Sequence, residues 1–223
     1  MVPAMSITRI HGSWLAAREK RLLISIASRL PAWVTPDRLT LLGLCGALLT
    51  GLAYIGSRHS AGFLWLAGLG LGLNWFGDSL DGTLARTRGI ERPVYGYFLD
   101  HSTDVISQVF IFLGLGLSRY LRFDAACLIL MSYWMAALLT FIRAVATKVF
   151  QISYFGIGPT EIRIALLVYT VVVGFAGRLE LPWFHITLID LFGFALFPLV
   201  FLSFVVMVKL ESKALAGRED QRL

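Results

Sequence analysis

Charged residues are scarce in this chain. Asp, Glu, Lys and Arg make up 15% of its 223 residues, whereas soluble domains carry about 25%. Hydrophobic residues reach 57%. This balance excludes an ordinary soluble domain and indicates a single membrane-embedded bundle of helices.

Cysteine is rare as well, since only Cys45 and Cys127 are present and both lie in apolar runs. They exclude a disulfide framework and a cysteine-ligated metal site, and we interpret them as small packing residues. The N-terminal stretch also lacks a short apolar run followed by a small-residue cleavage site. We therefore expect no cleavable signal peptide.

The net charge of +6 has two interpretations. One is binding to nucleic acid, and the other is contact with anionic lipids combined with cationic cytoplasmic loops. The apolar composition favours the second interpretation. We expect membrane lipids as partners and no nucleic acid.

Apolar segments of about the length needed to span hydrocarbon, roughly 20 residues, recur along the chain. Glycines in the second of them, at Gly68, Gly70 and Gly72, allow close helix packing in lipid. The sequence thus predicts an all-α integral membrane protein with six transmembrane helices. The predicted spans lie near residues 39–56, 61–80, 98–118, 124–147, 160–177 and 186–208.

An amphipathic helix is predicted before the first span, with Ser13 as its cap and a basic face formed by Arg18, Lys20 and Arg21. Such a helix fits the membrane interface, although an ordinary packed amphipathic helix has the same pattern. Thr35 and Pro36 then supply a cap and a first-turn proline for the first span.

Lys and Arg are distributed unevenly among the predicted loops, which indicates the orientation. If the N-terminus is inside, the outside loops hold only Arg58, Arg119, Arg122 and Arg178. Both termini and the loop between the second and third spans are then cytoplasmic. We expect a cytoplasmic N-terminal segment (1–38), a transmembrane catalytic domain (39–208) and a cytoplasmic tail (209–223). We interpret Asp190, at the start of the last span, as an exposed cap.

Four carboxylates lie at helical spacing around that cytoplasmic loop. Asp78 and Asp81 are three residues apart, and Asp100 and Asp104 are four apart, so each pair shares one helix face. If the two helices are antiparallel neighbours, the four acids converge. Ionised carboxylates in an apolar setting need a partner. All-oxygen ligation favours Mg²⁺ or Mn²⁺, with Ca²⁺ as an alternative. Pairing with nearby arginines in a solvated loop is the competing interpretation.

Small residues and an arginine adjoin the first acidic pair. Gly82 and Ala85 lie one turn apart and would let a bulky ligand approach the backbone. Arg86 could bind phosphate oxygens in a bidentate manner. Helix packing at Gly82 and an interfacial Arg86 explain the same residues equally well. Asn74, one turn before Asp78, could contact a nucleotide or a metal, or pack through a hydrogen bond.

This stretch resembles the signature of the CDP-alcohol phosphotransferase family, and every fixed position of the signature is filled. The resemblance extends through the six-helix layout over most of the chain. The matching pattern is Asp78-x-x-Asp81-Gly82-x-x-Ala85-Arg86, nine residues, then Gly96-x-x-x-Asp100-x-x-x-Asp104.

The resemblance implies a CDP-linked donor, an alcohol acceptor, release of CMP and phospholipid biosynthesis. It implies that Asp78, Asp81 and Asp100 hold two Mg²⁺ or Mn²⁺ ions and that Asp104 completes the site or acts as the base. Gly82, Ala85 and Arg86 would line the nucleotide pocket. It also implies a homodimer in a membrane, and the compact chain is compatible with a bacterial plasma membrane.

Two features resemble the choline/ethanolamine phosphotransferase branch, which uses CDP-choline or CDP-ethanolamine and diacylglycerol. They are His101 directly after Asp100, and Glu161 at the start of the fifth span. The resemblance implies His101 as base and Glu161 as its orienting acid. A packing histidine and a helix-start acid are the alternatives. Members of that branch have about ten spans, whereas six are predicted here.

The segment from Val34 to Thr40 instead resembles phosphatidylinositol-phosphate synthases, which use CDP-diacylglycerol and a small polar alcohol. Glycerol phosphate, inositol phosphate and serine are therefore alternative acceptors. Arg143 and Arg163 are weaker candidates for binding the lipid or acceptor; Arg143 could also snorkel to the interface, and Arg163 could pair with Glu161.

Two other functions are open to paired carboxylates in a membrane. A membrane prenyltransferase would need a different acidic motif. A cation carrier is the alternative outside enzymes, but such carriers often have two related halves. The acidic motif does not recur in the second half of this sequence.

Overall fold

The computed structural model describes residues 8–10, 16–147, 149–151, 158–181 and 186–220. The described part is helical apart from two three-residue strands, β1 (Thr8–Ile10) and β2 (Val149–Gln151), which pair in parallel. The predicted all-α class is confirmed apart from this strand pair and an isolated antiparallel bridge between Glu180 and Thr187. The helices are α1 (Ala16–Ala27), α2 (Pro36–Gly56), α3 (Phe63–Arg88), α4 (Pro93–Gly116), α5 (Phe123–Thr147), α6 (Pro159–Ala176) and α7 (Leu188–Asp220).

The six long helices overlap the six predicted spans, but they differ in how apolar they are. In the described part of the chain, four helices are long and apolar enough to cross a membrane: α2, α5, α6 and residues 188–217 of α7. The remaining two, α3 and α4, carry the acidic motif. The charged and polar residues of the motif lower the mean hydropathy of α3 and α4. That these two helices span the bilayer therefore stays a prediction.

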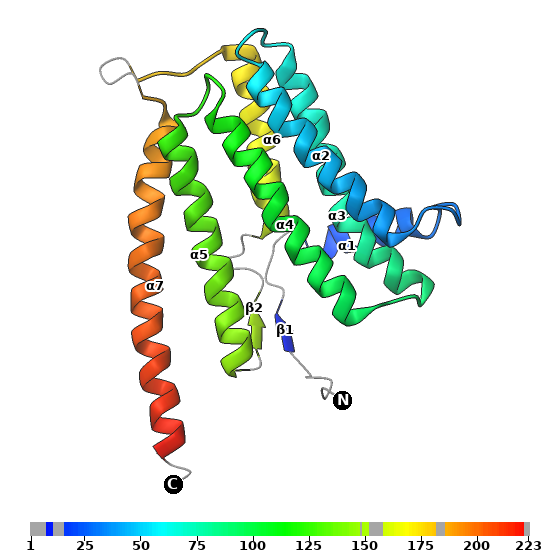
Figure 1. The fold of residues 1–223 in the computed structure, drawn as a ribbon, viewed down its shortest axis with the longest axis vertical. Helices are drawn as coiled ribbons and strands as arrows, with labels where there is room; N and C mark the ends of the chain where they lie inside the picture. Colours follow the sequence, from blue (N-terminus) through cyan, green and yellow to red (C-terminus); the bar gives the residue numbers. More distant parts are fainter. Residues whose placement is uncertain (1–7, 11–15, 148, 152–157, 182–185, 221–223) are drawn as a thin grey trace.

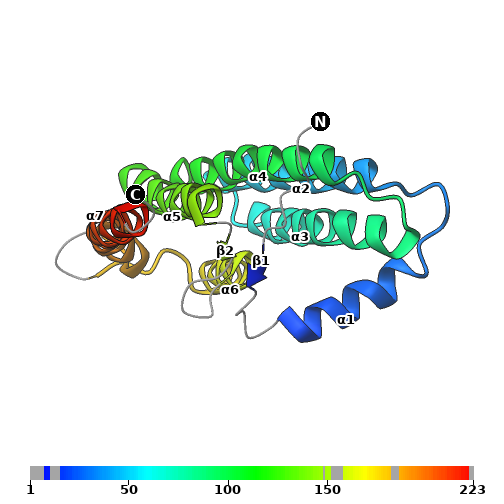
Figure 2. The same cartoon turned by 90° about the horizontal axis from the view of Figure 1, so that it is seen from below.

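The connections between helices gather at two ends of the molecule (Figure 1). The α2–α3 and α4–α5 connections lie at one end, and the α3–α4 connection lies toward the opposite end, as does the C-terminal part of α7. The predicted orientation also places the α2–α3 and α4–α5 connections on one side of the membrane, and the α3–α4 connection and the C-terminus on the other. Figure 2 shows α5 and α7 at one edge of the molecule and α1 beside α3 at the other.

Helix α1 packs against α3 through Leu23 and Ala27, which are 6% and 2% exposed. Its carboxylate at Glu19 accepts hydrogen bonds from the indole of Trp75 in α3 (2.8 Å) and the hydroxyl of Thr160 in α6 (2.9 Å). The packed-helix interpretation is therefore supported. Position at the membrane interface stays a prediction, and Ser13, its expected cap, lies outside the described residues.

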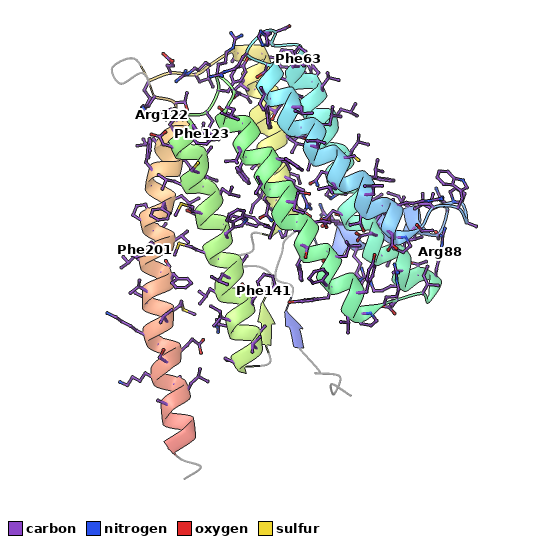
Figure 3. The ribbon with its side chains drawn as sticks, in the orientation of Figure 1. Phe63, Arg88, Arg122, Phe123, Phe141 and Phe201 are labelled. Carbon is purple, nitrogen blue, oxygen red and sulfur yellow. The ribbon has the colours of Figure 1, made fainter. Side chains whose placement is uncertain are left out.

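Helix α2 begins as predicted. The hydroxyl of Thr35 accepts a hydrogen bond from the backbone N–H of Arg38 (3.3 Å), and Pro36 occupies the first turn. At the same end, Arg88 of α3 donates to the carbonyls of Val34 (2.5 Å) and Leu30 (2.8 Å), and Figure 3 labels it there. The end of α3 is thereby fixed to the start of α2.

Glycines bring the backbones of α2 and α3 into contact. A Cβ on Gly77 would collide with backbone atoms of Leu39 and Gly43, and one on Gly46 would lie 2.8 Å from the carbonyl oxygen of Gly70. Of the predicted packing glycines, Gly70 therefore lies in this contact, whereas a Cβ on Gly72 would meet nothing within 4 Å. The close approach fixes which face of α3 is turned toward α2.

We expect Gly77→Ala to lower the thermal unfolding midpoint in detergent, because overpacking costs about 1–3 kcal/mol. The matched control is Gly72→Ala on the same helix, which has space for the methyl group. That control should keep or slightly raise the midpoint, since alanine is the better helix former by about 0.5–1 kcal/mol. Equal midpoints for the two variants would contradict the close packing of α2 on α3.

The exposed position predicted for Asp190 is wrong. Asp190 is fully buried. Its carboxylate accepts hydrogen bonds from the backbone N–H groups of Arg122 and Thr187, each at 2.7 Å. It caps the start of α7 as expected, but it also ties the α4–α5 connection to α7, and this second contact buries it.

Candidate active site

Three carboxylates from the C-terminal half of α3 and the N-terminal half of α4 lie close together. Asp78, Asp100 and Asp104 each offer one oxygen, and these oxygens all lie within 4.8 Å of one another. The short connection through Gly89, whose φ of 64° suits glycine, returns the chain so that the two acidic stretches face each other. The predicted convergence is correct for these three residues, which we call the carboxylate cluster.

Asp81 is turned toward α2. Its carboxylate accepts a hydrogen bond from the hydroxyl of Thr40 at 2.6 Å and another from the backbone N–H of Gly82. The side chain is buried, and the residue is 8% exposed. Asp81 thus lies outside the carboxylate cluster, although it lines one pocket with Asp78 and Asp100. Its role as a metal ligand stays a prediction.

Arg163 of α6 reaches into the carboxylate cluster. Its Nη2 lies 2.7 Å from an oxygen of Asp78 and 3.5 Å from an oxygen of Asp104. Its Nε donates to the side-chain oxygen of Asn74 (3.1 Å), and the amide nitrogen of Asn74 donates to the carbonyl of Gly43 (3.0 Å). The packing interpretation of Asn74 is therefore supported, and the sequence did not predict these partners for Arg163.

A pocket lined by several charged side chains, which we call the polar pocket, lies beside the carboxylate cluster, between the start of α2, the end of α3 and the start of α4. Its lining includes the predicted nucleotide-binding residues Gly82, Ala85 and Arg86 together with Asp78 and Asp100. Arg86 also donates to the hydroxyl of Thr83 (3.2 Å). These motif residues therefore line one pocket, whereas Asp104 and Asn74 are absent from its lining. Binding of a nucleotide there stays a prediction.

The rim of this pocket contains residues that the sequence analysis did not select. Arg92, just before α4, forms an ion pair with Asp37 at the start of α2 and lies 4.1 Å from the ring centre of Tyr95. The hydrogen bond that Arg92 donates to the carboxylate of Asp37 raises the pKa of Arg92 above its ordinary value. All three residues line the pocket. The only sequence signal for them was the Pro36-Asp37 entry to the first span.

His101 adjoins the carboxylate cluster. Its Nδ1 lies 3.7 Å from an oxygen of Asp100, and its ring packs edge-on against Tyr97 (4.3 Å between ring centres) and Phe141 (5.2 Å). Figure 3 labels Phe141 on α5. These contacts place an imidazole beside the carboxylates, and its role as base stays a prediction.

Glu161 contacts the start of its own helix, and Arg143 has a partner that the sequence did not indicate. A carboxylate oxygen of Glu161 accepts a hydrogen bond from the backbone N–H of Gly158 (2.9 Å), which caps α6. The helix-start interpretation of Glu161 is supported, and its pairing with His101 stays a prediction. Arg143 of α5 pairs with Glu211 of α7 at 2.7 Å. Lipid binding by Arg143 also stays a prediction.

A second pocket, of about 390 Å³, lies between α1, α3 and α6. Its wall is largely apolar and includes Leu71, Trp75, Ile164 and Leu167. Arg163 lines this pocket and also contacts the carboxylate cluster. An apolar space therefore adjoins the acidic centre across α3 and α6.

Comparison with known proteins gives a family and several relatives. The family described as CDP-alcohol phosphatidyltransferase matches residues 33–208. Cholinephosphotransferase 1 of Gallus gallus is 30% identical over 164 residues, which are 68% of this chain and 47% of that protein.

Two shorter matches are to synthases of inositol phosphate lipids. Archaetidylinositol phosphate synthase of Pyrococcus horikoshii is 33% identical over 104 residues, covering 47% of this chain and 52% of that protein. Phosphatidylinositol phosphate synthase of Cutibacterium acnes is 39% identical over 88 residues, covering 40% of each chain. The matched part of this chain thus spans about half or less of the length of these relatives.

Proposed function

Because the chain belongs to the CDP-alcohol phosphatidyltransferase family, we propose that it transfers a phosphoalcohol unit from a CDP-linked donor to an acceptor hydroxyl and releases CMP. The observation that carries this proposal is the position of the carboxylate cluster. It adjoins a polar pocket whose lining includes the other fixed residues of the motif, Asp81, Gly82, Ala85, Arg86 and Gly96. Phospholipid biosynthesis is the setting to which the family belongs.

The carboxylate cluster fits a divalent cation. Its donor atoms are carboxylate oxygens, which suit Mg²⁺ or Mn²⁺, and a guanidinium already stands among them as a cation. We propose that Asp78, Asp100 and Asp104, with Asp81 from the same pocket, hold two such ions. When bound, the ions would neutralise the donor diphosphate and the CMP leaving group.

The protein's own groups position the substrates and move one proton. Arg86 would bind diphosphate oxygens, while Gly82 and Ala85 leave room for the nucleotide beside the backbone. His101 would accept the proton of the attacking hydroxyl, with Glu161 as its orienting acid. Asp104, a member of the carboxylate cluster, is the other candidate base. Arg163 and Arg143 would bind the lipid or the acceptor.

The donor and the acceptor define two candidate reactions. We favour a CDP-choline or CDP-ethanolamine donor with a diacylglycerol-like acceptor, because His101 follows Asp100 and the cholinephosphotransferase match is long. Phosphatidyl transfer from CDP-diacylglycerol to glycerol phosphate, inositol phosphate or serine is the second candidate. The match to phosphatidylinositol phosphate synthase and the Thr35-Pro36-Asp37 entry favour it. The apolar pocket beside Arg163 suits a lipid in either reaction.

The four apolar helices and the family make the chain an integral membrane protein. We propose that α3 and α4 also span the bilayer, giving six spans over residues 39–208, and that α1 lies at the interface. Both termini and the active site would face the cytoplasm of a bacterial plasma membrane. A homodimer is our proposal for the assembly.

We expect purified protein in detergent to release CMP only when Mg²⁺ or Mn²⁺ is present, and to stop when EDTA removes the metal. CDP-choline and CDP-ethanolamine would be tested with diacylglycerol. CDP-diacylglycerol would be tested with glycerol phosphate, inositol phosphate and serine. CMP from the first set supports the favoured reaction, and CMP only from the second set moves the assignment to phosphatidyl transfer. Metal-independent CMP release would contradict the proposed site.

A further inference from the structure

Arg163 places a guanidinium in contact with the carboxylate cluster. Its Nη2 lies 2.7 Å from Asp78 and 3.5 Å from Asp104, so one guanidinium serves two of the three acids. The Arg163 side chain is only 15% exposed. The contact is therefore shielded from solvent, and the charge of the guanidinium acts on these carboxylates at short range.

The guanidinium is tethered in this position. Its Nε donates to Asn74, and Asn74 in turn donates to the backbone carbonyl of Gly43 on α2. Asn74 is 2% exposed, and the glycine contacts between α2 and α3 surround it. Both functional ends of the amide are used, so Asn74 holds Arg163 in place against the neighbouring backbone.

A tethered guanidinium has a direct consequence for metal binding. It cancels one of the negative charges that a divalent ion would use, and it repels that ion at close range. Mg²⁺ is usually bound by one or two carboxylates together with substrate phosphates. A diphosphate bound in the polar pocket would supply the negative charge that Arg163 removes.

We propose that Arg163 is a built-in counter-ion that weakens divalent-metal binding by the carboxylate cluster until the diphosphate of the donor is bound. This inference rests on the proposed function, because it takes the carboxylate cluster as the metal site. Asn74 is then a positioning residue, since it acts through Arg163. Metal and nucleotide bind together in this scheme, and the carboxylates have a partner in the absence of both.

The test is a titration of purified full-length protein with Mn²⁺, with and without CDP, in which free Mn²⁺ is measured by electron paramagnetic resonance. For the unaltered protein we expect CDP to tighten Mn²⁺ binding at least about tenfold. We expect Arg163→Gln to tighten Mn²⁺ binding without CDP by at least about tenfold, equivalent to about 1.4 kcal/mol. The further gain from CDP should shrink. Arg163→Lys keeps the charge but loses the Nε contact with Asn74, so it should tighten Mn²⁺ binding by a smaller factor than Arg163→Gln.

Arg178→Gln is the matched control, because it removes a guanidinium that pairs with Glu180 at the other end of the molecule. Its Mn²⁺ affinity should not change. Asn74→Ala loosens the tether and keeps the charge, so it should tighten Mn²⁺ binding in the same direction by a smaller factor. It also provides the test if Arg163→Gln does not fold.

Unchanged or weaker Mn²⁺ binding in folded Arg163→Gln, or in Asn74→Ala where the first variant does not fold, would overturn the inference and leave the metal site intact. Absence of Mn²⁺ binding in the unaltered protein, with and without CDP, would overturn the metal site and the inference together. The two failures are therefore distinguishable without an activity assay.

Discussion

Asp100→Asn is expected to lower metal-dependent CMP release by at least about 1,000-fold. The substitution keeps the size of the side chain and replaces an anionic oxygen with a neutral amide. Asp100 belongs to the carboxylate cluster and also lines the polar pocket, so it adjoins both the proposed metal site and the proposed nucleotide site. The measurement is initial CMP release at saturating donor and acceptor, together with Mn²⁺ affinity in the presence of CDP.

The matched control is Asp124→Asn, which makes the same chemical change in an exposed acid at the opposite end. Asp124 pairs with Arg122 at 2.6 Å, and an exposed pair of this kind contributes little to the free energy of unfolding. We expect near-normal turnover and Mn²⁺ affinity from this variant. If Asp100→Asn kept a tenth or more of the turnover, the carboxylate cluster would not be the catalytic metal site.

The carboxylate cluster could be predicted because its determinants are local. Spacings of three and four residues place each acidic pair on one helix face, and the connection between α3 and α4 is too short to separate them. The pocket residues Gly82, Ala85 and Arg86 follow from the same helix. Convergence of Asp78, Asp100 and Asp104 therefore needs only two helices and the turn between them.

Contacts that depend on the rotation of one helix against another could not be predicted. Asp81 shares a helix face with Asp78, but the glycine contacts between α2 and α3 turn it toward Thr40. Arg163 lies on α6, far along the chain from the carboxylate cluster. The partner that the sequence suggested for it was Glu161, two residues away. Asp190 was expected at the surface because its second partner, the N–H of Arg122, lies in another connection.

Family resemblance leaves two candidates for the base, His101 and Asp104, and substitution of His101 can distinguish them. His101→Ala is expected to lower the rate of the chemical step at least about 100-fold, the usual scale for loss of a general base. The structure gives the physical reason, since the imidazole adjoins Asp100 of the carboxylate cluster and is packed between Tyr97 and Phe141. Single-turnover CMP release with donor and acceptor bound measures this step.

A role as base predicts that His101→Ala changes the chemical step alone. Mn²⁺ affinity and CDP affinity should stay within about threefold of the unaltered protein, because proton transfer does not contribute to the binding of either. Asp104→Asn, by contrast, should weaken Mn²⁺ binding because Asp104 belongs to the carboxylate cluster. His59→Ala, in the exposed connection between α2 and α3, is the matched control and should keep full activity. Retention of the single-turnover rate in His101→Ala would return the role of base to Asp104.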